Sequence, residues 1–351
     1  MTKRPEAKRP GLADLAQEAG VSLATVDRVL NGREAVRPET AARVAEAAAR
    51  LGHPAAAWLV PTALALPELR FGVVLHKGAQ EFYRDFAAGL AMAVAQAQGV
   101  RGRLVLEYAT SQSPAEVAAL MRAMAGRCDV LAATAVNHPE ITAAVSAIQG
   151  QGLPVFALLS DFAQGVREGY LGVNNLKVGR VAGWMLSLAA QASGRGTAKV
   201  AAFVGGHRWQ GHELREAGFR AYLREVAPGL TVLDTLVNLE TRALTHEATL
   251  ALLDRHPDLC GLYVAGGGME GAITALREMR HPGEVALVVH ELTSDSRAGL
   301  AEGWVNLVVA TPLPRLCRDL VAQMIRAAQQ GAGAVAAQHF LTPDLHLAES
   351  I

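Results

Sequence analysis

The stretch Leu12–Asn31, LADLAQEAGVSLATVDRVLN, has the pattern of two short helices joined by a tight turn. Ala16 is small enough to let the two helices approach closely, and Gly20 can adopt the left-handed conformation that ends the first of them. Val26 and Val29 then supply a shared apolar core. These residue types at these spacings predict a helix-turn-helix, although any small helical bundle can carry them.

The second helix of the pair turns one face outward, where such a motif meets base edges and phosphates. Arg28 can donate two hydrogen bonds to a guanine, whereas Leu23 and Ala24 suit thymine methyl groups. Asp27 beside them would repel phosphate unless Arg28 pairs with it. We expect the DNA contacts to come from Ser22, Leu23, Ala24, Thr25, Arg28 and Asn31.

A third helix is expected over 38–51, since Pro38 suits a first helical turn and Val44, Ala48 and Leu51 fall on one face. Basic residues are modestly enriched around these helices, and Lys8 or Arg9 would either contact phosphate or simply aid solubility. The basic positions before and within this region are Lys3, Arg4, Lys8, Arg9, Arg28, Arg33, Arg37, Arg43 and Arg50.

Composition places the chain among globular proteins, with one small and one large domain expected in its 351 residues. Hydrophobic residues make up 51% and charged residues 19%, and the net charge is zero. Cys128, Cys260 and Cys317 are far apart, which indicates buried thiols in a reducing cytoplasm rather than a metal site. The sequence shows neither a signal-peptide pattern nor an apolar run of membrane length, so we expect a cytoplasmic protein without membrane contact.

From Arg70 onward, short apolar runs alternate with amphipathic stretches of helical length. This alternation predicts the α/β class, with parallel sheets flanked by helices, and about nine units predict two lobes. The expected strands are 71–75, 104–108, 129–133, 154–159, 198–204, 231–237, 261–265, 285–290 and 305–309. The expected helices are 82–98, 114–126, 139–149, 175–192, 210–226, 241–255, 270–279 and 314–330.

Sequence motifs of nucleotide-dependent and hydrolytic enzymes are missing. The loop after the first strand reads HKGAQEFYRDF and has no GxGxxG, and the chain has no GxxxxGK, HExxH or GxSxG pattern. The run Gly266-Gly267-Gly268 could approach a phosphate, but it more simply allows close backbone packing. We therefore expect neither catalysis nor a cofactor.

The segment Leu12–Leu51 resembles the headpiece of the lactose-repressor (LacI/GalR) family, through AxxAGVSxxTVxRVLNG, VxxxT and a final LG. Residues 70–347 look like the type I periplasmic-binding-protein core of these regulators, through EFYRDFAAGL, CDVLAATAVNHPE, YLGVNNLKVGR and GHELREAGF. The resemblance implies a headpiece at 1–54, a linker at 55–69 and a core at 70–351. Lobe 1 would span about 70–172 and 312–330, and lobe 2 about 173–311 and 331–347, with crossings near Val173, Thr311 and Gln330.

The resemblance also implies an effector cleft between the lobes. Phe82 and Tyr83 would stack on a sugar ring, or alternatively form part of the core between the lobes. Arg215 would donate two hydrogen bonds to ligand oxygens, or alternatively form a surface salt bridge with Glu213 or Glu216. Asn137 and His138 would bind hydroxyls or cap a helix. The expected effector residues are Phe82, Tyr83, Asn137, His138, Asp161, Asn175, Arg215, His290 and Glu291.

Three departures from the family stand out. Glycines stand where many relatives have Asn-Asp after the strand at 261–265, and His290-Glu291 stands where relatives often have an aspartate. The linker HPAAAWLVPTALALPEL lacks the family's hinge-helix pattern, so that Leu59 would be the minor-groove wedge of a short helix ended by Pro61.

These observations predict a cytoplasmic transcriptional repressor that binds a palindromic operator in double-stranded DNA as a homodimer, or as a tetramer. Its effector would be a small polar molecule such as a sugar, polyol or sugar acid. The main alternative is a solute-binding receptor of a sugar transporter, which the headpiece disfavours. An enzyme that acts in the cleft is the third possibility.

Overall fold

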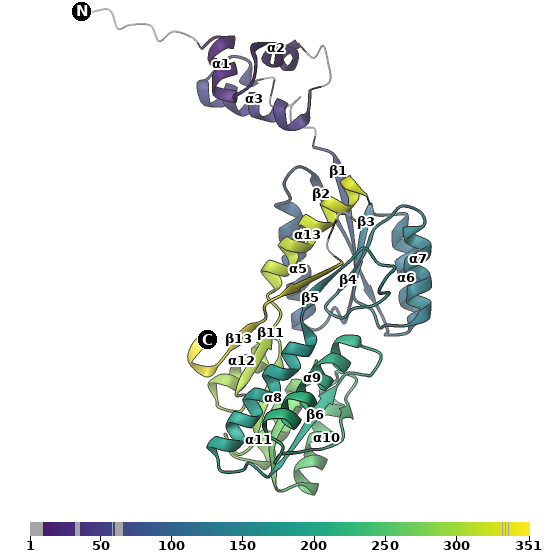
Figure 1. Cartoon of the computed structure of the whole chain (residues 1–351), viewed down its shortest axis with the longest axis vertical. Coiled ribbons are helices and arrows are strands. Elements are labelled where there is room, and N and C mark those ends of the chain that lie inside the picture. The colour runs from purple at the N-terminus through teal and green to yellow at the C-terminus, as the bar shows by residue number, and fades with distance from the viewer. Residues whose placement is uncertain are drawn as a thin grey trace, which may run out of the picture. The chain divides into compact units, whose positions relative to one another are not determined.

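The computed structural model describes residues 10–31, 36–57, 59, 66–331, 333, 335 and 337–351 (Figure 1). The chain divides into two units, Met1–Glu68 with Gln98–Arg101 and Leu69–Ala97 with Gly102–Ile351.

The first unit contains three helices, α1 (Leu12–Ala19), α2 (Leu23–Asn31) and α3 (Pro38–Leu51). Gly20 ends α1 with a φ of 62°, and its N–H donates to the carbonyls of the last turn of that helix. Leu15, Val26 and Val44 are fully buried among alanines, so the small residues do permit close helix packing. The helix-turn-helix prediction is confirmed.

The first lobe of the second unit is built on a six-stranded sheet of order β12-β5-β4-β3-β1-β2. The pairs β1–β3, β3–β4, β4–β5 and β5–β12 are parallel. Helices α5 and α13 lie side by side on one face, and α6 and α7 cover the other (Figure 1). The bounds are β1 (Glu68–His76), α5 (Glu81–Ala95), β2 (Arg101–Ala109), α6 (Pro114–Ala125), β3 (Val130–Ala133), α7 (Pro139–Gln149), β4 (Val155–Leu158), β5 (Gly169–Val173), α13 (Leu313–Gln330) and β12 (Gln338–Leu341).

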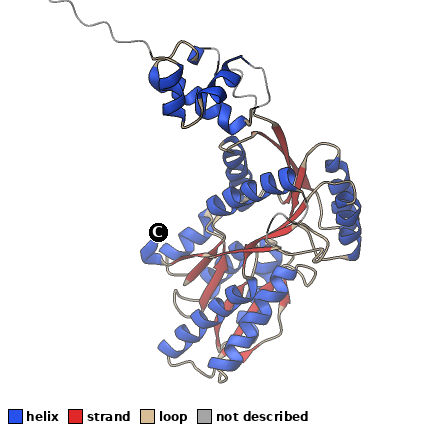
Figure 2. Ribbon diagram, turned by 45° about the horizontal axis from the view of Figure 1, so that its top comes forward, coloured by secondary structure: helices blue, strands red, loops and turns tan. Residues whose placement is uncertain are grey.

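The second lobe is built on a seven-stranded sheet of order β13-β11-β10-β9-β6-β7, with β8 also paired to β6. Helices again flank the sheet (Figure 2). Helices α8 and α9 pack on one face, and α10, α11 and α12 pack on the other. The bounds are α8 (Asn175–Ala192), β6 (Lys199–Val204), α9 (Gln210–Val226), β7 (Thr231–Val232), β8 (Leu236–Val237), α10 (Arg242–Arg255), β9 (Leu259–Val264), α11 (Met269–Met279), β10 (Ala286–His290), α12 (Ser294–Ala301), β11 (Leu307–Ala310), β13 (Asp344–His346) and the 3₁₀ turn η1 (Ala348–Ser350).

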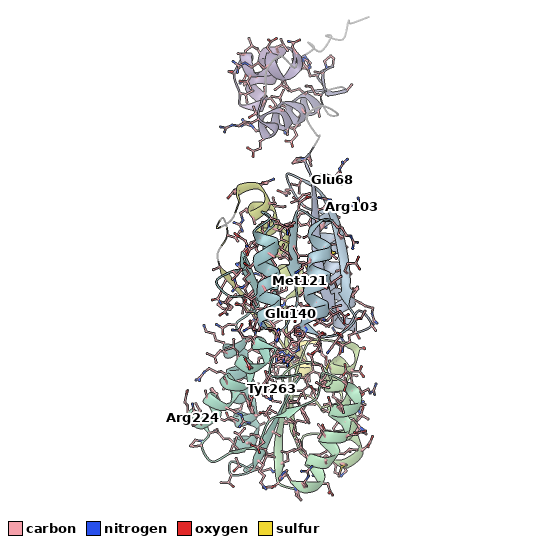
Figure 3. All side chains as sticks on the ribbon, turned by 90° about the vertical axis from the view of Figure 1, so that its right-hand side faces the viewer. Glu68, Arg103, Met121, Glu140, Arg224 and Tyr263 are labelled. Atoms are coloured by element: carbon pink, nitrogen blue, oxygen red, sulfur yellow. The ribbon has the colours of Figure 1, made fainter. Side chains whose placement is uncertain are left out.

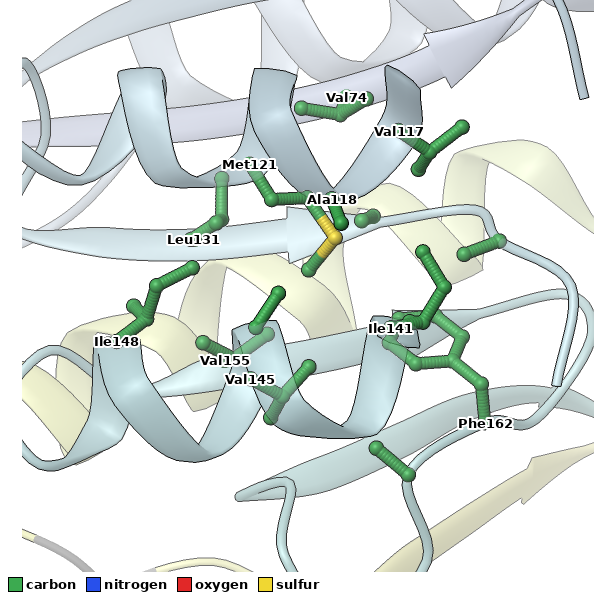
Figure 4. Packing of buried hydrophobic residues seen from close by; sticks show 14 of the residues in the cluster. Val74, Val117, Ala118, Met121, Leu131, Ile141, Val145, Ile148, Val155 and Phe162 are labelled. Atoms are coloured by element: carbon green, nitrogen blue, oxygen red, sulfur yellow. The ribbon is translucent and has the colours of Figure 1, made fainter. Parts of the chain in front are cut away.

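Each lobe has a dry core between its sheet and its helices. In the first lobe, Met121 from α6 and Ile141 from α7 pack on Leu131 and Val155 of the sheet (Figure 4). In the second lobe, Tyr263 lies in the interior, whereas Arg224 lies at the surface (Figure 3). These rigid cores fix the strand ends from which the cleft is built.

Helices α8 and α9 approach more closely than side chains normally permit. A Cβ atom on Gly179 would lie 1.9 Å from the Arg215 carbonyl oxygen, and one on Gly218 would lie 2.0 Å from the Leu176 carbonyl oxygen. Glycine at both positions therefore sets the distance of α9 from α8, and with it the place of Arg215.

The chain crosses between the lobes after β5, after β11 and between β12 and β13. The expected third crossing near Gln330 is wrong, because β12 still pairs with β5 in the first lobe, with Leu341 opposite Val173. The crossing therefore lies at 342–343. Of the segment 331–347 that was expected in lobe 2, only β13 joins the second sheet. Edge strand β12, QHFL, is mostly solvent-accessible and lacks the apolar run that marked the central strands.

Three other elements were not predicted. The two glycines of strand β5, GYLGV, interrupt the apolar run that would have indicated a strand. The short helix α12 begins with polar residues. Strand β13 has three residues. The single strand expected at 231–237 is two separate short strands, β7 and β8.

Candidate functional site

The outward face of α2 presents the side chains expected to meet DNA. Ser22 caps this helix, since the Thr25 N–H donates to its Oγ at 3.1 Å, and the two hydroxyls are 2.8 Å apart. Leu23 is 53% exposed, and Ala24 and Arg28 are also exposed. The face is available for groove contact, and the base contacts themselves stay a prediction.

Asn31 at the end of α2 is engaged within the helix. Its Nδ2 donates to the Asp27 Oδ1 at 2.7 Å and to the Asp27 carbonyl at 3.1 Å. Asn31 thereby uses its amide donors on Asp27, and a contact of Asn31 with DNA stays a prediction.

Two of the basic residues serve the headpiece itself. Arg43 Nη2 donates to the carbonyls of Ala19 and Gly20, at 2.6 and 2.9 Å, and so caps the end of α1. Arg50 pairs with Glu18 at 2.9 Å. The basic positions Lys3, Arg4, Lys8, Arg9 and Arg33 lie outside the described residues.

A cavity of about 520 Å³ lies between the two lobes of the second unit. It opens at the carboxyl ends of β3, β4, β9, β10 and β11, the edge where ligands bind in parallel sheets. The first lobe contributes Phe82, Tyr83, Thr134 and Ser160, and the second contributes Trp209, His212, Arg215, Glu240, Gly266, Gly267, His290 and Glu291. Its size suits a small molecule.

Phe82 and Tyr83, at the start of α5, give the cavity its aromatic wall. Their rings meet edge to face with centroids 5.2 Å apart. Burial raises the pKa of the Tyr83 hydroxyl, which therefore stays protonated and can donate to a ligand.

Arg215 lines the cavity and is 8% exposed, so the surface salt bridge with Glu213 or Glu216 is wrong. Its Nε donates to Asn175 Oδ1 and its Nη1 to the Ala265 carbonyl, both at 2.7 Å. Within the described residues it forms neither an ion pair nor a hydrogen bond through Nη2. This nitrogen is thus available to a ligand oxygen.

Asn175 does not line the cavity. Its Nδ2 donates to the Leu159 carbonyl at 3.1 Å and to the Tyr170 hydroxyl at 3.3 Å, so its oxygen faces Arg215. Asn175, expected to bind the ligand, is instead a positioning residue, because its amide group is fully engaged in hydrogen bonds that orient the Arg215 guanidinium.

His290 and Glu291 line the cavity at the end of β10. His290 Nε2 lies 2.9 Å from the Tyr263 hydroxyl, and burial lowers the pKa of this imidazole well below its usual value. Glu291 has a φ of 67° and accepts from the N–H and the hydroxyl of Thr311, at 2.8 and 2.7 Å. Burial raises the pKa of its carboxyl group.

Asp161 is not part of the cavity lining, so the expectation for it is wrong. Its carboxylate forms a buried two-point pair with Arg167, at 2.5 Å to Nε and 2.6 Å to Nη2, and also accepts from Gln164. With its oxygens bound in this way, it stabilises the loop after β4.

Asn137 and His138 also lie away from the cavity, on a separate shallow hollow beside α7. His138 Nδ1 accepts from the Glu140 N–H at 3.3 Å, so it caps that helix, as the alternative interpretation had it. Asn137 is exposed, and its N–H donates to the Arg208 carbonyl.

Glu240, His212 and Lys77 were missed as site residues. Glu240 follows β8 in a loop whose sequence carries no motif, and its carboxylate meets Lys77 of the first lobe at 2.5 Å. Burial alone would raise the pKa of Glu240, but His212 and Lys77 outweigh it and lower the pKa to about 2. The adjacent glycines at 266–267 were the available signal, because they leave room for this side chain.

Several hydrogen bonds join the lobes around the cavity. Glu81 of the first lobe accepts from the N–H and hydroxyl of Ser294 at the start of α12, at 2.9 and 2.6 Å. Ser160 Oγ accepts from the Gly211 N–H at 3.0 Å. With the Lys77–Glu240 pair, these contacts hold the cleft in a closed arrangement.

Comparison with protein families gives two matches on this chain. Residues 71–332 match a model described as "Periplasmic binding protein domain", and residues 11–54 match "Bacterial regulatory proteins, lacI family". The chain belongs to the lacI family of regulators, with a periplasmic binding protein domain as its core. This lacI-family protein is therefore a DNA-binding regulator, and neither matched family is enzymatic.

The core of this lacI-family protein shares its fold with solved transporter receptors. A sugar-binding protein of a sugar ABC transporter from Bacillus halodurans matches with a TM-score of 0.70 at 16% identity, over 80% of this chain and 98% of that one. A solute-binding protein from Agrobacterium vitis with alpha-D-tagatopyranose gives 0.72 at 17%, over 80% and 95%. One from Burkholderia graminis with D-arabinose gives 0.71 at 20%, over 81% and 96%.

A comparison with curated proteins found no match. None of the described helices combines the length and apolarity needed to cross a membrane. The described residues also contain no cluster of three His, Cys, Asp or Glu side chains that could hold a metal ion.

The linker of this lacI-family protein departs from the expected hinge. Leu59 is 1% exposed and packs with Leu15, Val44 and Ala55 in the headpiece core, so its expected role as a minor-groove wedge is wrong for this structure. Its N–H donates to the Ala55 carbonyl at 2.9 Å, which makes a single turn. Removing so buried a leucine from its packing opposes insertion between bases. The expected stop at Pro61 lies outside the described residues.

Leu59→Ala should therefore destabilise the headpiece by about 2–5 kcal/mol, because it opens a cavity in a small core. Amide hydrogen exchange over α1–α3 measures this, with Leu23→Ala at an exposed position of the same unit as the control. Exchange rates for Leu59→Ala equal to those of the unmodified chain would contradict the packing role.

Proposed function

We propose that this protein is a transcriptional repressor that binds a palindromic operator as a homodimer and is controlled by a small polyhydroxylated effector. The effector class is a sugar, polyol or sugar acid, and the site is the cavity between the lobes. The protein acts in the compartment that holds the DNA.

One observation carries this proposal: a helix-turn-helix headpiece and a two-lobed core with a cavity lined by polar and aromatic side chains occur in a single chain. A receptor that serves only a transporter has no use for the headpiece. The solute-binding alternative therefore explains the core alone.

The dimer follows from how little DNA one headpiece can read. A single recognition helix reaches only a few base pairs, which is too few for specific binding among many competing sites. Two headpieces on two half-sites multiply the discrimination, and the operator then carries matching two-fold symmetry.

The effector class follows from the groups that line the cavity. Arg215 offers a donor, Glu240 and Glu291 offer acceptors, and Phe82 and Tyr83 offer an apolar wall for a ring face. The ligands named for the similar folds, D-arabinose and alpha-D-tagatopyranose, are of this kind.

Binding to the DNA upstream of its own gene, measured by gel shift with and without candidate sugars and polyols, tests the proposal. We expect a specific complex that at least one such compound weakens. A specific complex that no compound alters would contradict effector control, and the lack of any specific complex would contradict the DNA-binding role of the headpiece.

Arg28→Ala should weaken specific operator binding by about 1–3 kcal/mol, since a guanidinium on this exposed face of α2 can bond a guanine edge. The melting temperature of the core should stay unchanged, because the substitution lies in the other unit. Footprinting and titration measure the effect, and Arg122→Ala, which removes an exposed charge from α6, is the matched control. An unchanged operator preference would contradict this placement of α2.

Arg215→Ala should lower effector affinity by about 2–4 kcal/mol, because charge-assisted hydrogen bonds are lost and ligand oxygens stay unpaired in a buried site. Operator affinity without effector should barely change. Calorimetry with the compound found by gel shift measures the loss, and Arg224→Ala on the exposed side of the same helix is the control. Equal affinities for the Arg215 variant and the unmodified chain would remove Arg215 from the site.

A further inference from the structure

Two glycines beside the cavity, Gly205 and Gly266, leave room for two side chains that the sequence did not single out. A Cβ atom on Gly205 would lie 2.4 Å from Glu240 Cγ and 2.8 Å from His212 Cε1. A Cβ atom on Gly266 would lie 2.8 Å from Glu240 Oε1 and from His212 Nε2. Larger residues at these positions would displace the carboxylate and the imidazole, so the backbone is shaped around this pair.

Two contacts hold the Glu240 carboxylate, and a third hydrogen bond holds its backbone. Lys77 Nζ contacts Oε2 at 2.5 Å, and the Gly267 N–H donates to Oε1 at 3.2 Å. The backbone of Glu240 has a φ of 55°, and its N–H donates to the Asn238 Oδ1 at 2.9 Å. A non-glycine residue in this conformation is held there by its surroundings, which is typical of functional positions.

The hydrogen-bonding role of His212 is determined by its other nitrogen. The Gly205 N–H donates to Nδ1 at 3.1 Å, so Nδ1 carries no proton. Burial lowers the pKa of this imidazole to about 4, and the ring is therefore neutral at physiological pH. Nε2 must then carry the proton and act as a donor.

The donor and the acceptor face each other without bonding. His212 Nε2 and Glu240 Oε1 are 3.6 Å apart, which is too long for a hydrogen bond, and both residues line the cavity. One hydroxyl group can accept from Nε2–H and donate to Oε1 at the same time. A carboxylate cannot donate and an ammonium cannot accept, so neither satisfies both partners.

We propose that His212 and Glu240 together bind one hydroxyl group of the effector and thereby select a neutral polyhydroxy compound over the corresponding sugar acid. This inference rests on the proposed function, because it concerns the same cavity. Lys77 contributes by fixing Oε2 and by compensating the buried negative charge.

Calorimetric titration of the full chain with matched sugars, alditols and aldonates, beginning with the D-arabinose and D-allose series, tests the proposal. The unmodified chain should bind a neutral member at least about tenfold more tightly than its aldonate, since a carboxylate in this cavity is repelled by Glu240 and, at the pair itself, offers it no donor. An aldonate that binds as tightly as its neutral counterpart, or no binding by any neutral member, overturns the proposal.

Two variants separate charge selection from a mere structural role of the ion pair. Glu240→Gln should reduce the neutral-to-aldonate affinity ratio by about tenfold or more, because the amide carries no charge and offers the aldonate a donor. Lys77→Arg keeps the counter-charge that holds Glu240 ionised, so the ratio should stay close to that of the unmodified chain. A loss of the ratio in Lys77→Arg as large as that in Glu240→Gln would show a structural role and overturn the proposal.

Glu216→Gln, which removes a carboxylate from α9 outside the cavity, is the control and should leave the ratio unchanged. The gel shift separates the two levels of the account. If an aldonate binds and alters operator affinity, the proposed function stands and this inference fails. If neutral compounds bind without altering operator affinity, selection by Glu240 stands and effector control fails.

Discussion

The buried guanidinium of Arg215 lines the cavity, and no carboxylate among the described residues pairs with it. Arg215 is bound through Nε and Nη1 by neutral oxygens, one from Asn175 and one from the end of β9. Its distance from α8 depends on Gly179, where a side chain would collide with the backbone of α9. Burying the positive charge of Arg215 costs free energy unless further oxygen acceptors bind it. In the proposed function, the effector supplies these oxygens.

Contacts between residues of the two lobes hold the cleft closed. The loop after β1 and the start of α5 supply Lys77 and Glu81, which bond to Glu240 and Ser294 of the opposite lobe. An effector that binds among these groups can favour one lobe arrangement only through contacts that differ between arrangements. Leu59 packs in the core of the headpiece, so it is not exposed as a minor-groove wedge in this structure.

Elements with a clear hydrophobic periodicity or a known motif could be predicted from the sequence. Helices α8 and α9 were predicted with the observed bounds, because long amphipathic patterns identify buried faces. Edge strand β12 escaped prediction, because it buries little and its partner strand is distant in sequence. Asp161 was misassigned because a strand-end carboxylate looks the same whether it faces a ligand or Arg167. Glu240 was missed because only the fold brings its loop to the glycines after β9.

The central claim is that the cavity and the operator-binding headpiece are coupled through the lobes, and thermodynamic linkage tests it most directly. Effector affinity, measured by calorimetry with and without saturating operator DNA, should change by the same factor by which the effector changes operator affinity, because coupling free energies are reciprocal. A repressor released by its effector should bind that effector more weakly on the operator. Effector affinity that is identical with and without operator would contradict the account.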